Sequence, residues 1–324
     1  MSKNSKIVII LGIISLILLL FYPLCGLHFL GFKDIIHNPE AAFIFFNYRL
    51  PRVLISFVTG AMLAISGLAF QSIFANILAT PYTLGISSAA SLGAILALFL
   101  GAEWSFHFLD ASILLAIVAT FIAIMCLYIF SRVNSIQNRD RILLLGVALN
   151  FLCSSLIIFL QMQMDYLNTF KVMHWLIGSI QNISYEVLIV LSIVAIICMA
   201  LIYKKNRELD LMSLGEEFAQ SKGVEVQKTR WFLIVVTSVM IGTVIAFLGP
   251  IAFVGLIIPN VCRLIVGSKH TFLFWSSLFL GGILLMSADV LSRIVMPPLE
   301  VPVGVITSFL GAIFFIYYLM KKPA

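Results

Sequence analysis

A short acidic stretch near the middle of the chain is the strongest candidate for a contact with a partner protein. Residues 204–230 are the only long polar interruption in an otherwise apolar sequence, and within them stands the run Leu214-Gly215-Glu216-Glu217-Phe218. A glycine before two carboxylates predicts a turn and then an acidic first helical turn, which the positive end of a helix dipole favours. With Gly223 closing the stretch, we expect a short exposed helix. Composition alone equally allows a solvated connector whose charges keep it out of lipid.

Three arginines form a second candidate contact site. Arg49 and Arg52 precede the apolar run 53–75, and Arg293 follows the run 272–290. An arginine at a membrane boundary most often anchors a helix end to lipid phosphate. Because arginine also pairs bidentately with carboxylates, a docking patch for an acidic external protein is the alternative. From these residues alone, lipid anchoring is the preferred interpretation.

The residues needed for catalysis, nucleotide binding or metal binding do not form a recognisable pattern. No GxxxxGK[ST] motif occurs, so the chain has no P-loop of its own. Asp165 and Asp289 lie near span ends, and we interpret them as interfacial rather than as a proton relay. The five histidines show no metal-ligand spacing, so no metal site and no catalytic residue are predicted: His28, His37, His107, His174 and His270. A lone secondary transporter and an intramembrane enzyme are therefore the weaker alternatives to a transport subunit powered by another chain.

The composition indicates a membrane protein. Of 324 residues, 62% are hydrophobic and only 10% are charged, and the mean hydropathy is +1.13. So few charges cannot cover a water-exposed surface. Since a crossing takes roughly 20 helical residues, the chain has room for about ten. Hydropathy predicts an all-α polytopic protein with spans at 7–24, 53–75, 85–101, 111–131, 142–163, 186–203, 232–248, 251–267, 272–290 and 303–320.

The distribution of basic residues predicts the orientation of these spans. Placing the N-terminus inside puts fifteen of the 20 lysines and arginines on the inner side and five on the outer side. This asymmetry predicts that both termini are cytoplasmic and that residues 204–230 form a cytoplasmic segment of a single membrane domain, residues 1–324. The basic residues lack interleaved aromatics, so we expect contacts with anionic lipid and none with nucleic acid.

Glycine and proline lie inside the predicted spans. Gly60 and Gly67 are seven residues apart on one helix face, which predicts close helix packing. Pro259 lies inside the span 251–267, where it frees a backbone carbonyl. Such a carbonyl is tolerated only where protein or a water-filled path covers it.

Several motifs together resemble one transporter family. They run from Arg49-Leu50-Pro51-Arg52 through Leu84-Gly85-Ile86-Ser87-Ser88-Ala89-Ala90, Trp175-Leu176-Ile177-Gly178-Ser179, Leu214-Gly215-Glu216-Glu217, Gly249-Pro250-Ile251-Ala252-Phe253-Val254-Gly255 and Ala288-Asp289 to Val301-Pro302-Val303-Gly304. In order and content the chain resembles the FecCD/BtuC permeases, the membrane subunits of type II ABC importers for iron-siderophore, haem and cobalamin.

This resemblance implies a ten-helix permease of the bacterial inner membrane. It also implies three kinds of protein partner: a second permease copy (a homodimer) or a paralogue, two ATPase subunits, and a periplasmic or lipid-anchored substrate-binding protein. ATP and Mg would belong to the ATPase, with no cofactor in this chain. We expect a ferric siderophore as substrate, with haem or cobalamin as alternatives.

The resemblance also implies roles for the two candidate sites. The residues that match the family's ATPase-coupling loop are Leu214, Gly215, Glu216, Glu217, Phe218 and Gly223. Arg49, Arg52 and Arg293 match residues that receive glutamates of the binding protein, which raises docking above lipid anchoring. Asn138, Arg139 and Asp140 fall where a relative has its inner gate.

The chain departs from the family pattern at three positions. Asn260 replaces a usual histidine, Ile77 a usual proline and Ala75 a common arginine. The role of position 260 is therefore open, whereas we expect the other two changes to alter only the beginning of a helix.

Overall fold

The computed structural model describes residues 2–26, 29–102, 105–106, 109–133, 139–180, 184–296 and 299–321. Ten apolar helices match the ten predicted spans: α1 (Lys3–Phe21), α4 (Leu50–Ile73), α5 (Ile86–Phe99), α6 (Ala111–Val133), α7 (Arg139–Met162), α9 (Tyr185–Lys204), α12 (Val226–Leu248), α13 (Val254–Val266), α14 (His270–Ile294) and α15 (Val303–Lys321). Within the described ranges, seven are long and apolar enough to cross a membrane, and α5, α13 and α15 are shorter apolar helices. The prediction of an all-α polytopic membrane protein is confirmed.

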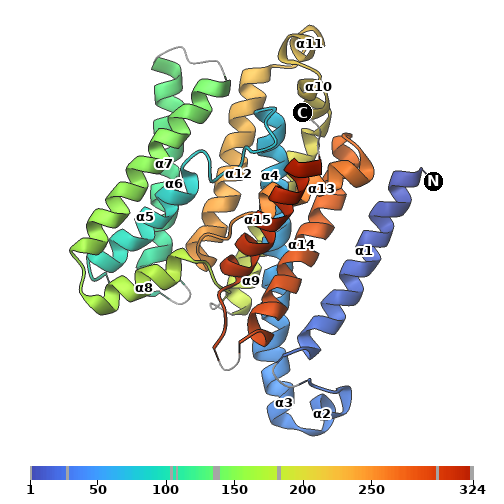
Figure 1. The fold of residues 1–324 in the computed structure, drawn as a ribbon, viewed down its shortest axis with the longest axis vertical. Helices are drawn as coiled ribbons and strands as arrows, with labels where there is room; N and C mark the ends of the chain where they lie inside the picture. Colours follow the sequence, from blue (N-terminus) through green and yellow to red (C-terminus); the bar gives the residue numbers. More distant parts are fainter. Residues whose placement is uncertain are drawn as a thin grey trace.

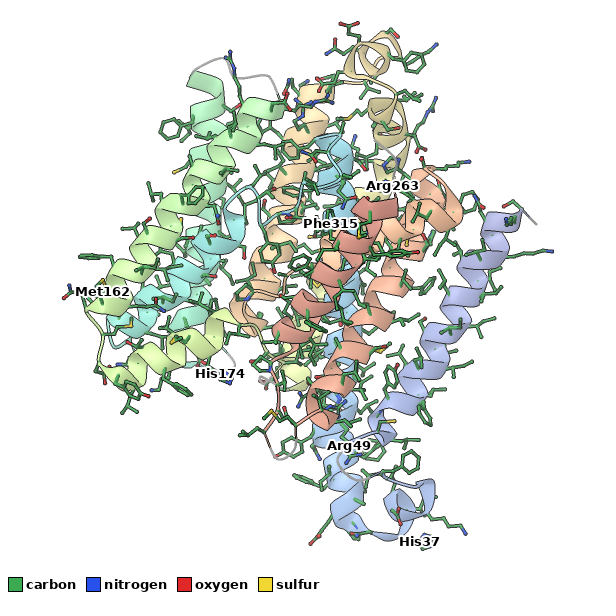
Figure 2. All side chains as sticks on the ribbon, in the orientation of Figure 1. His37, Arg49, Met162, His174, Arg263 and Phe315 are labelled. Atoms are coloured by element: carbon green, nitrogen blue, oxygen red, sulfur yellow. The ribbon has the colours of Figure 1, made fainter. Side chains whose placement is uncertain are left out.

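Short elements connect these helices. They are the 3-10 turn η1 (Tyr22–Leu24), α2 (Phe32–His37), α3 (Pro39–Ile44), the π-helical η2 (Phe45–Arg49), β1 (Ser105–Phe106) paired antiparallel with β2 (Leu109–Asp110), α8 (Tyr166–Leu176), α10 (Asn206–Ser213) and α11 (Glu216–Ser221). In Figure 1, α10 and α11 lie at one end of the bundle, called here the α11 end, and α2 and α3 lie at the other. Figure 2 places Arg49 near α3, so this second end is called the arginine end. Helix α1 begins, and α15 finishes, toward the α11 end (Figure 1).

Helix α4 forms the centre of the bundle. In its most apolar stretch 83% of the residues are buried, and the helix packs against α9, α12, α13 and α14. The glycine stripe predicted on this helix makes two of these contacts close. A Cβ built on Gly60 would lie 2.2 Å from the carbonyl oxygen of Gly281 in α14, and one on Gly67 would lie 1.8 Å from that of Gly255 in α13. Because no side chain fits between them, the backbones themselves are in contact at both crossings.

The proline in α13 is compensated by a side chain from α4. Pro259 has no amide hydrogen, so the carbonyl of Gly255, four residues earlier, loses its usual helical donor. Gln71 Nε2 donates to that carbonyl at 3.3 Å and to the carbonyl of Leu256 at 3.2 Å. Arg263 donates to the other end of the Gln71 amide. The expected protein cover over the freed carbonyl is therefore present, and it comes from the neighbouring helix.

Two of the three departures from the family pattern, Asn260 and Ile77, are in contact beside Pro259. Asn260 Nδ2 donates to the carbonyl of Leu256 at 2.8 Å and to that of Ile77 at 3.3 Å, and Asn260 Oδ1 accepts from Arg263 at 3.1 Å. Ala75, just past the end of α4, has a left-handed backbone with φ of +45°. Asn260 thus ties α13 to the turn that follows α4, and positions 77 and 260 belong to one contact.

Candidate functional site

The predicted coupling stretch forms an exposed helix at the α11 end. Helix α11 begins at Glu216, directly after Gly215, whose φ of +128° only glycine adopts readily. The short helix with an acidic first turn is therefore confirmed. Leu214 is 70% exposed and Phe218 42% exposed, although both are large and apolar. Two such side chains beside carboxylates form a surface suited to a protein partner.

The two glutamates of this helix have different surroundings. Glu217 is exposed, whereas Glu216 accepts a 2.6 Å hydrogen bond from Arg230 in α12. The Arg230 side chain is fully buried, and Arg139 at the start of α7 lies 4.0 Å from the same Glu216 oxygen. Arg230 therefore lies inside the bundle, at the start of α12, and pairs with the acidic helix from there. Glu216 ties α11 to the bundle, and Glu217 stays available to a partner.

Two of the three predicted gate residues and most of the predicted coupling residues line one cavity. This cavity of about 690 Å³ is lined by Arg139, Asp140, Leu214, Gly215, Glu216, Glu217 and Phe218. Asn138 lies outside the described residues. Gly223, with φ of +83°, lies apart in the turn after α11, where it borders a second cavity of about 500 Å³ with Lys205 and Lys228. The predicted gate and the predicted coupling stretch are separated in the sequence, but they thus meet where α7 begins beside α11.

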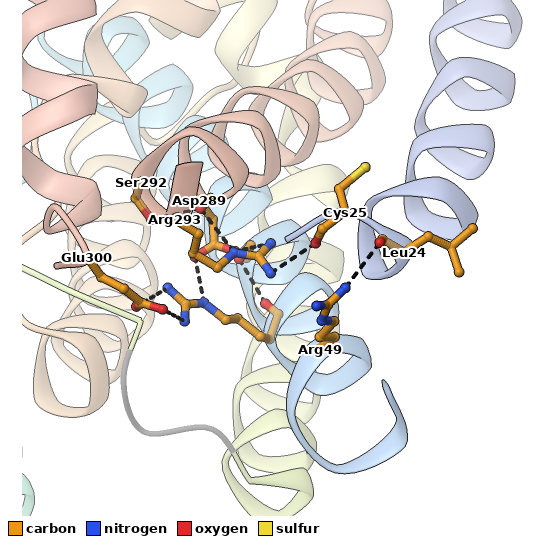
Figure 3. A network of polar contacts seen from close by, with 9 residues as sticks. Leu24, Cys25, Arg49, Asp289, Ser292, Arg293 and Glu300 are labelled. Carbon is orange, nitrogen blue, oxygen red and sulfur yellow. Dashed lines mark hydrogen bonds and ion pairs between the residues drawn. The ribbon is translucent and has the colours of Figure 1, made fainter. Parts of the chain in front are cut away.

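The three predicted arginines converge at the arginine end (Figure 3). Arg52 Nε donates to Asp289 Oδ1 at 2.8 Å, while its two terminal nitrogens face the carboxylate of Glu300 at 3.2 and 3.0 Å. Arg293 Nη2 lies 3.1 Å from Asp289 Oδ2. Asp289 lies near the end of α14, as predicted, but it has no exposed surface and is enclosed by the bundle. Its carboxylate lies between the two guanidinium groups, and together with Glu300 it balances their charge.

The arginine site also holds the turn that follows α1. Arg49 donates to the carbonyl of Leu24 at 3.1 Å, and Arg293 donates to that of Cys25 at 3.4 Å. A cavity of about 260 Å³ opens beside them and is lined by Gly26, Ile44, Tyr48, Arg49, Arg52, Arg293 and Glu300. Because Arg52 and Arg293 are buried and form ion pairs with carboxylates, lipid anchoring does not describe these two residues.

Comparison with known proteins agrees with this architecture. The model of the FecCD transport family matches residues 8–321. The vitamin B12 import system permease protein BtuC of Vibrio vulnificus is 36% identical over 282 residues, covering 85% of this chain and 82% of that protein. The Fe(3+) dicitrate transport system permease protein FecD of Escherichia coli is 34% identical over 282 residues, covering 87% and 86%.

A solved inward-facing conformation of a metal-chelate type ABC transporter has the same fold, with a TM-score of 0.89 and 28% identity over 98% of this chain and 100% of that chain. These relatives are named as permease proteins of an ABC transporter and of import or transport systems. The bundle is accordingly a transport subunit and not an enzyme. With the family match covering nearly its whole length, this multi-pass membrane protein belongs to the FecCD transport family.

Proposed function

We propose that this chain is the permease of an ATP-driven importer that moves a large iron chelate, a ferric siderophore, across the bacterial inner membrane. The main support for this proposal is the exposed helix α11, which presents Leu214, Glu217 and Phe218 beyond the end of an apolar bundle. Because these side chains are exposed, they are available to the surface of an ATPase. The similarity to FecD, named for iron dicitrate transport, supports the iron chelate. Haem or cobalamin is the second candidate, favoured by the similarity to BtuC.

The proposed orientation places the α11 end in the cytoplasm, together with both termini. Its support is the excess of basic residues predicted for that side and the common end at which α1 begins and α15 finishes (Figure 1). Two ATPase subunits, carrying ATP and Mg, would then contact α11. Arg49, Arg52 and Arg293 would face the external binding protein, whose carboxylates match guanidinium groups.

Transport requires no bond chemistry in this chain. A second copy, or a paralogue, would pair with it and leave the path between the two. The helices would alternate between two packings whose populations are biased by ATP at one end and by the binding protein at the other. In this scheme Arg139 and Asp140, which share a cavity with α11, would respond to the ATPase at the inner mouth.

The first test asks whether an ATPase binds to α11. The chain is purified in mild detergent from its own membrane, and the copurifying proteins and ATP hydrolysis are compared with those of a Glu217→Arg, Phe218→Asp variant. Glu216 is left intact because it bonds to the buried Arg230. The matched control is Glu186→Arg, an exposed acid in the first turn of α9.

We expect the wild type and the control to retain an ATPase that the α11 variant loses. Absence of any ATPase from all three preparations would overturn the importer assignment and favour a lone secondary transporter. The substrate is tested on the cognate binding protein by calorimetry with ferric hydroxamates, ferric catecholates, haem and cobalamin. Binding of cobalamin or haem, with none of the ferric chelates, would overturn the siderophore assignment alone.

A further inference from the structure

A histidine at the α11 end joins three helices. His270 is the first residue of α14, and only 3% of its surface is exposed. Its Nδ1 lies 2.6 Å from Asp210 Oδ1 in α10, and its Nε2 lies 2.7 Å from Ser72 Oγ near the end of α4. The helix that continues into α11 is thus hydrogen-bonded through one imidazole to two helices of the membrane bundle.

Asp210 also caps α14. The same Oδ1 that faces the ring accepts the backbone amide of His270 at 2.8 Å. The residue at the cap position itself, Lys269, makes no side-chain cap. A carboxylate at a helix N-terminus is favoured by the helix dipole. Burial acts to raise the pKa of Asp210, but the hydrogen bonds from His270 and the nearby charge of Lys269 outweigh it and lower that pKa.

An aspartate, a histidine and a serine in a row also describe a hydrolytic triad, but this serine is not placed to attack a substrate. Ser72 is buried, and its hydroxyl donates to the carbonyl of Leu68 at 2.7 Å within α4. A nucleophile must be reachable by its substrate. The cluster is therefore a structural link between helices.

The two helices reached by this link also carry the arginine site. Helices α4 and α14 meet backbone to backbone at Gly60 and Gly281, so one cannot slide far without the other. At the arginine end the same pair is joined by Arg52 and Asp289. Since Arg52 and Ser72 are 20 residues apart on one helix, the two connections lie about 30 Å from each other.

We propose that Asp210, His270 and Ser72 are the positioning residues that transmit movement of the coupling segment to the α4–α14 pair, and through it to the arginine site. This inference rests on the proposed importer function. In it, a nucleotide bound at the ATPase shifts α11 and α10, and Asp210 carries the shift to the start of α14. Binding at the two ends of the bundle is then thermodynamically coupled.

The experiment measures that coupling without any transported substrate. The permease, with its ATPase, is reconstituted in nanodiscs, and the Kd of the ligand-free cognate binding protein is measured with and without Mg–AMP-PNP. The ratio of the two Kd values reports coupling, which typically amounts to about 5- to 150-fold. The variants are Asp210→Ala, Asp210→Asn, which keeps an acceptor oxygen, and Ser72→Ala. Ser238→Ala is the control, because Ser238 is likewise buried and, among the residues that the structure describes, its hydroxyl bonds to the carbonyl of Ile234 in its own helix.

In the Asp210→Ala variant we expect the ATPase to stay bound and the ratio of the two Kd values to fall below about twofold. The wild type should keep a larger ratio. Asp210→Asn should restore most of the ratio, Ser72→Ala should give an intermediate value, and Ser238→Ala should match the wild type. A wild-type ratio in both Asp210→Ala and Ser72→Ala overturns the transmission role. If Asp210→Ala does not assemble, Ser72→Ala alone decides. Loss of the ATPase from the wild type would instead be a failure of the proposed function.

Discussion

Arg52 Nε donates to Asp289 Oδ1 at 2.8 Å, and this contact joins the first turn of α4 to the last turns of α14. Both side chains are almost fully buried, and Arg293 shares the same carboxylate. Replacing Asp289 by Asn therefore leaves two guanidinium groups beside a neutral amide. We expect a loss of about 3–5 kcal/mol in the free energy of unfolding. The measurement is an SDS titration followed by tryptophan fluorescence, with the exposed Asp110→Asn as control. Equal stability of the two variants would contradict this account.

Glu300 competes with any external carboxylate for Arg52. It faces the two terminal nitrogens of Arg52, its side chain is 46% exposed, and it lines the cavity beside the three arginines. Replacing Glu300 by Gln should tighten binding of the cognate binding protein about three- to tenfold, the equivalent of about 1 kcal/mol. Biolayer interferometry with immobilised permease measures the affinity, and Glu40→Gln in the nearby α3 is the control. Weaker binding by the Gln variant would show that Glu300 itself contacts the partner.

The adjacent glutamates of α11 should respond differently to the same substitution. Glu216→Gln removes the charge beside the fully buried guanidinium of Arg230 and should cost about 2–3 kcal/mol of stability. Glu217→Gln changes an exposed side chain and should alter stability by less than about 0.5 kcal/mol. Denaturation of the permease alone separates these effects from ATPase binding. The assignment fails if both variants unfold at the same denaturant concentration.

The contact between α4 and α13 should tolerate no side chain. Gly67→Ala places a methyl group against the carbonyl of Gly255 and should destabilise the bundle by about 1–3 kcal/mol or more, because the two helices must separate. Gly12→Ala is the matched control, since a Cβ there would lie 3.4 Å from the Phe279 ring, an ordinary contact. Thermal unfolding in one detergent compares them. A stable Gly67→Ala protein would mean that α13 moves freely relative to α4.

Much of the fold is predictable because the membrane imposes simple rules. Runs of apolar residues of sufficient length locate all ten helices, and Gly215 with the acidic pair locates the start of α11. The glycine stripe on α4 predicts close packing without naming the partner. Only the folded chain shows that Gly60 meets α14 and that Gly67 meets α13.

Two ion pairs that join separate helices could not be predicted from spacing. Glu216 and Arg230 are 14 residues apart in sequence and Arg52 and Asp289 are 237 apart, so no helical period connects either pair. A buried arginine in a membrane protein does require compensation, and that requirement is the signal which points to Asp289. His270 was missed for a different reason. The partners of His270 are a carboxylate and a hydroxyl on two other helices, so metal-ligand spacing along the chain gives no sign of them.

Because Arg52 and Asp289 are far apart in the sequence, the ribosome also adds them to the chain at different times. Ribosomes add roughly 5–20 residues per second, so about 10–50 s pass between the two residues as the 237-residue interval is made. During that time α4 has already left the ribosome, although neither Asp289 nor the glycine face of α14 exists. Arg52 lies at the very start of α4, where a guanidinium can remain among lipid headgroups until its carboxylate arrives. Helix α4, the most central helix of the finished bundle, is therefore one of the first to be inserted, and it stays in the membrane before helices that pack against it, such as α14, have been synthesised.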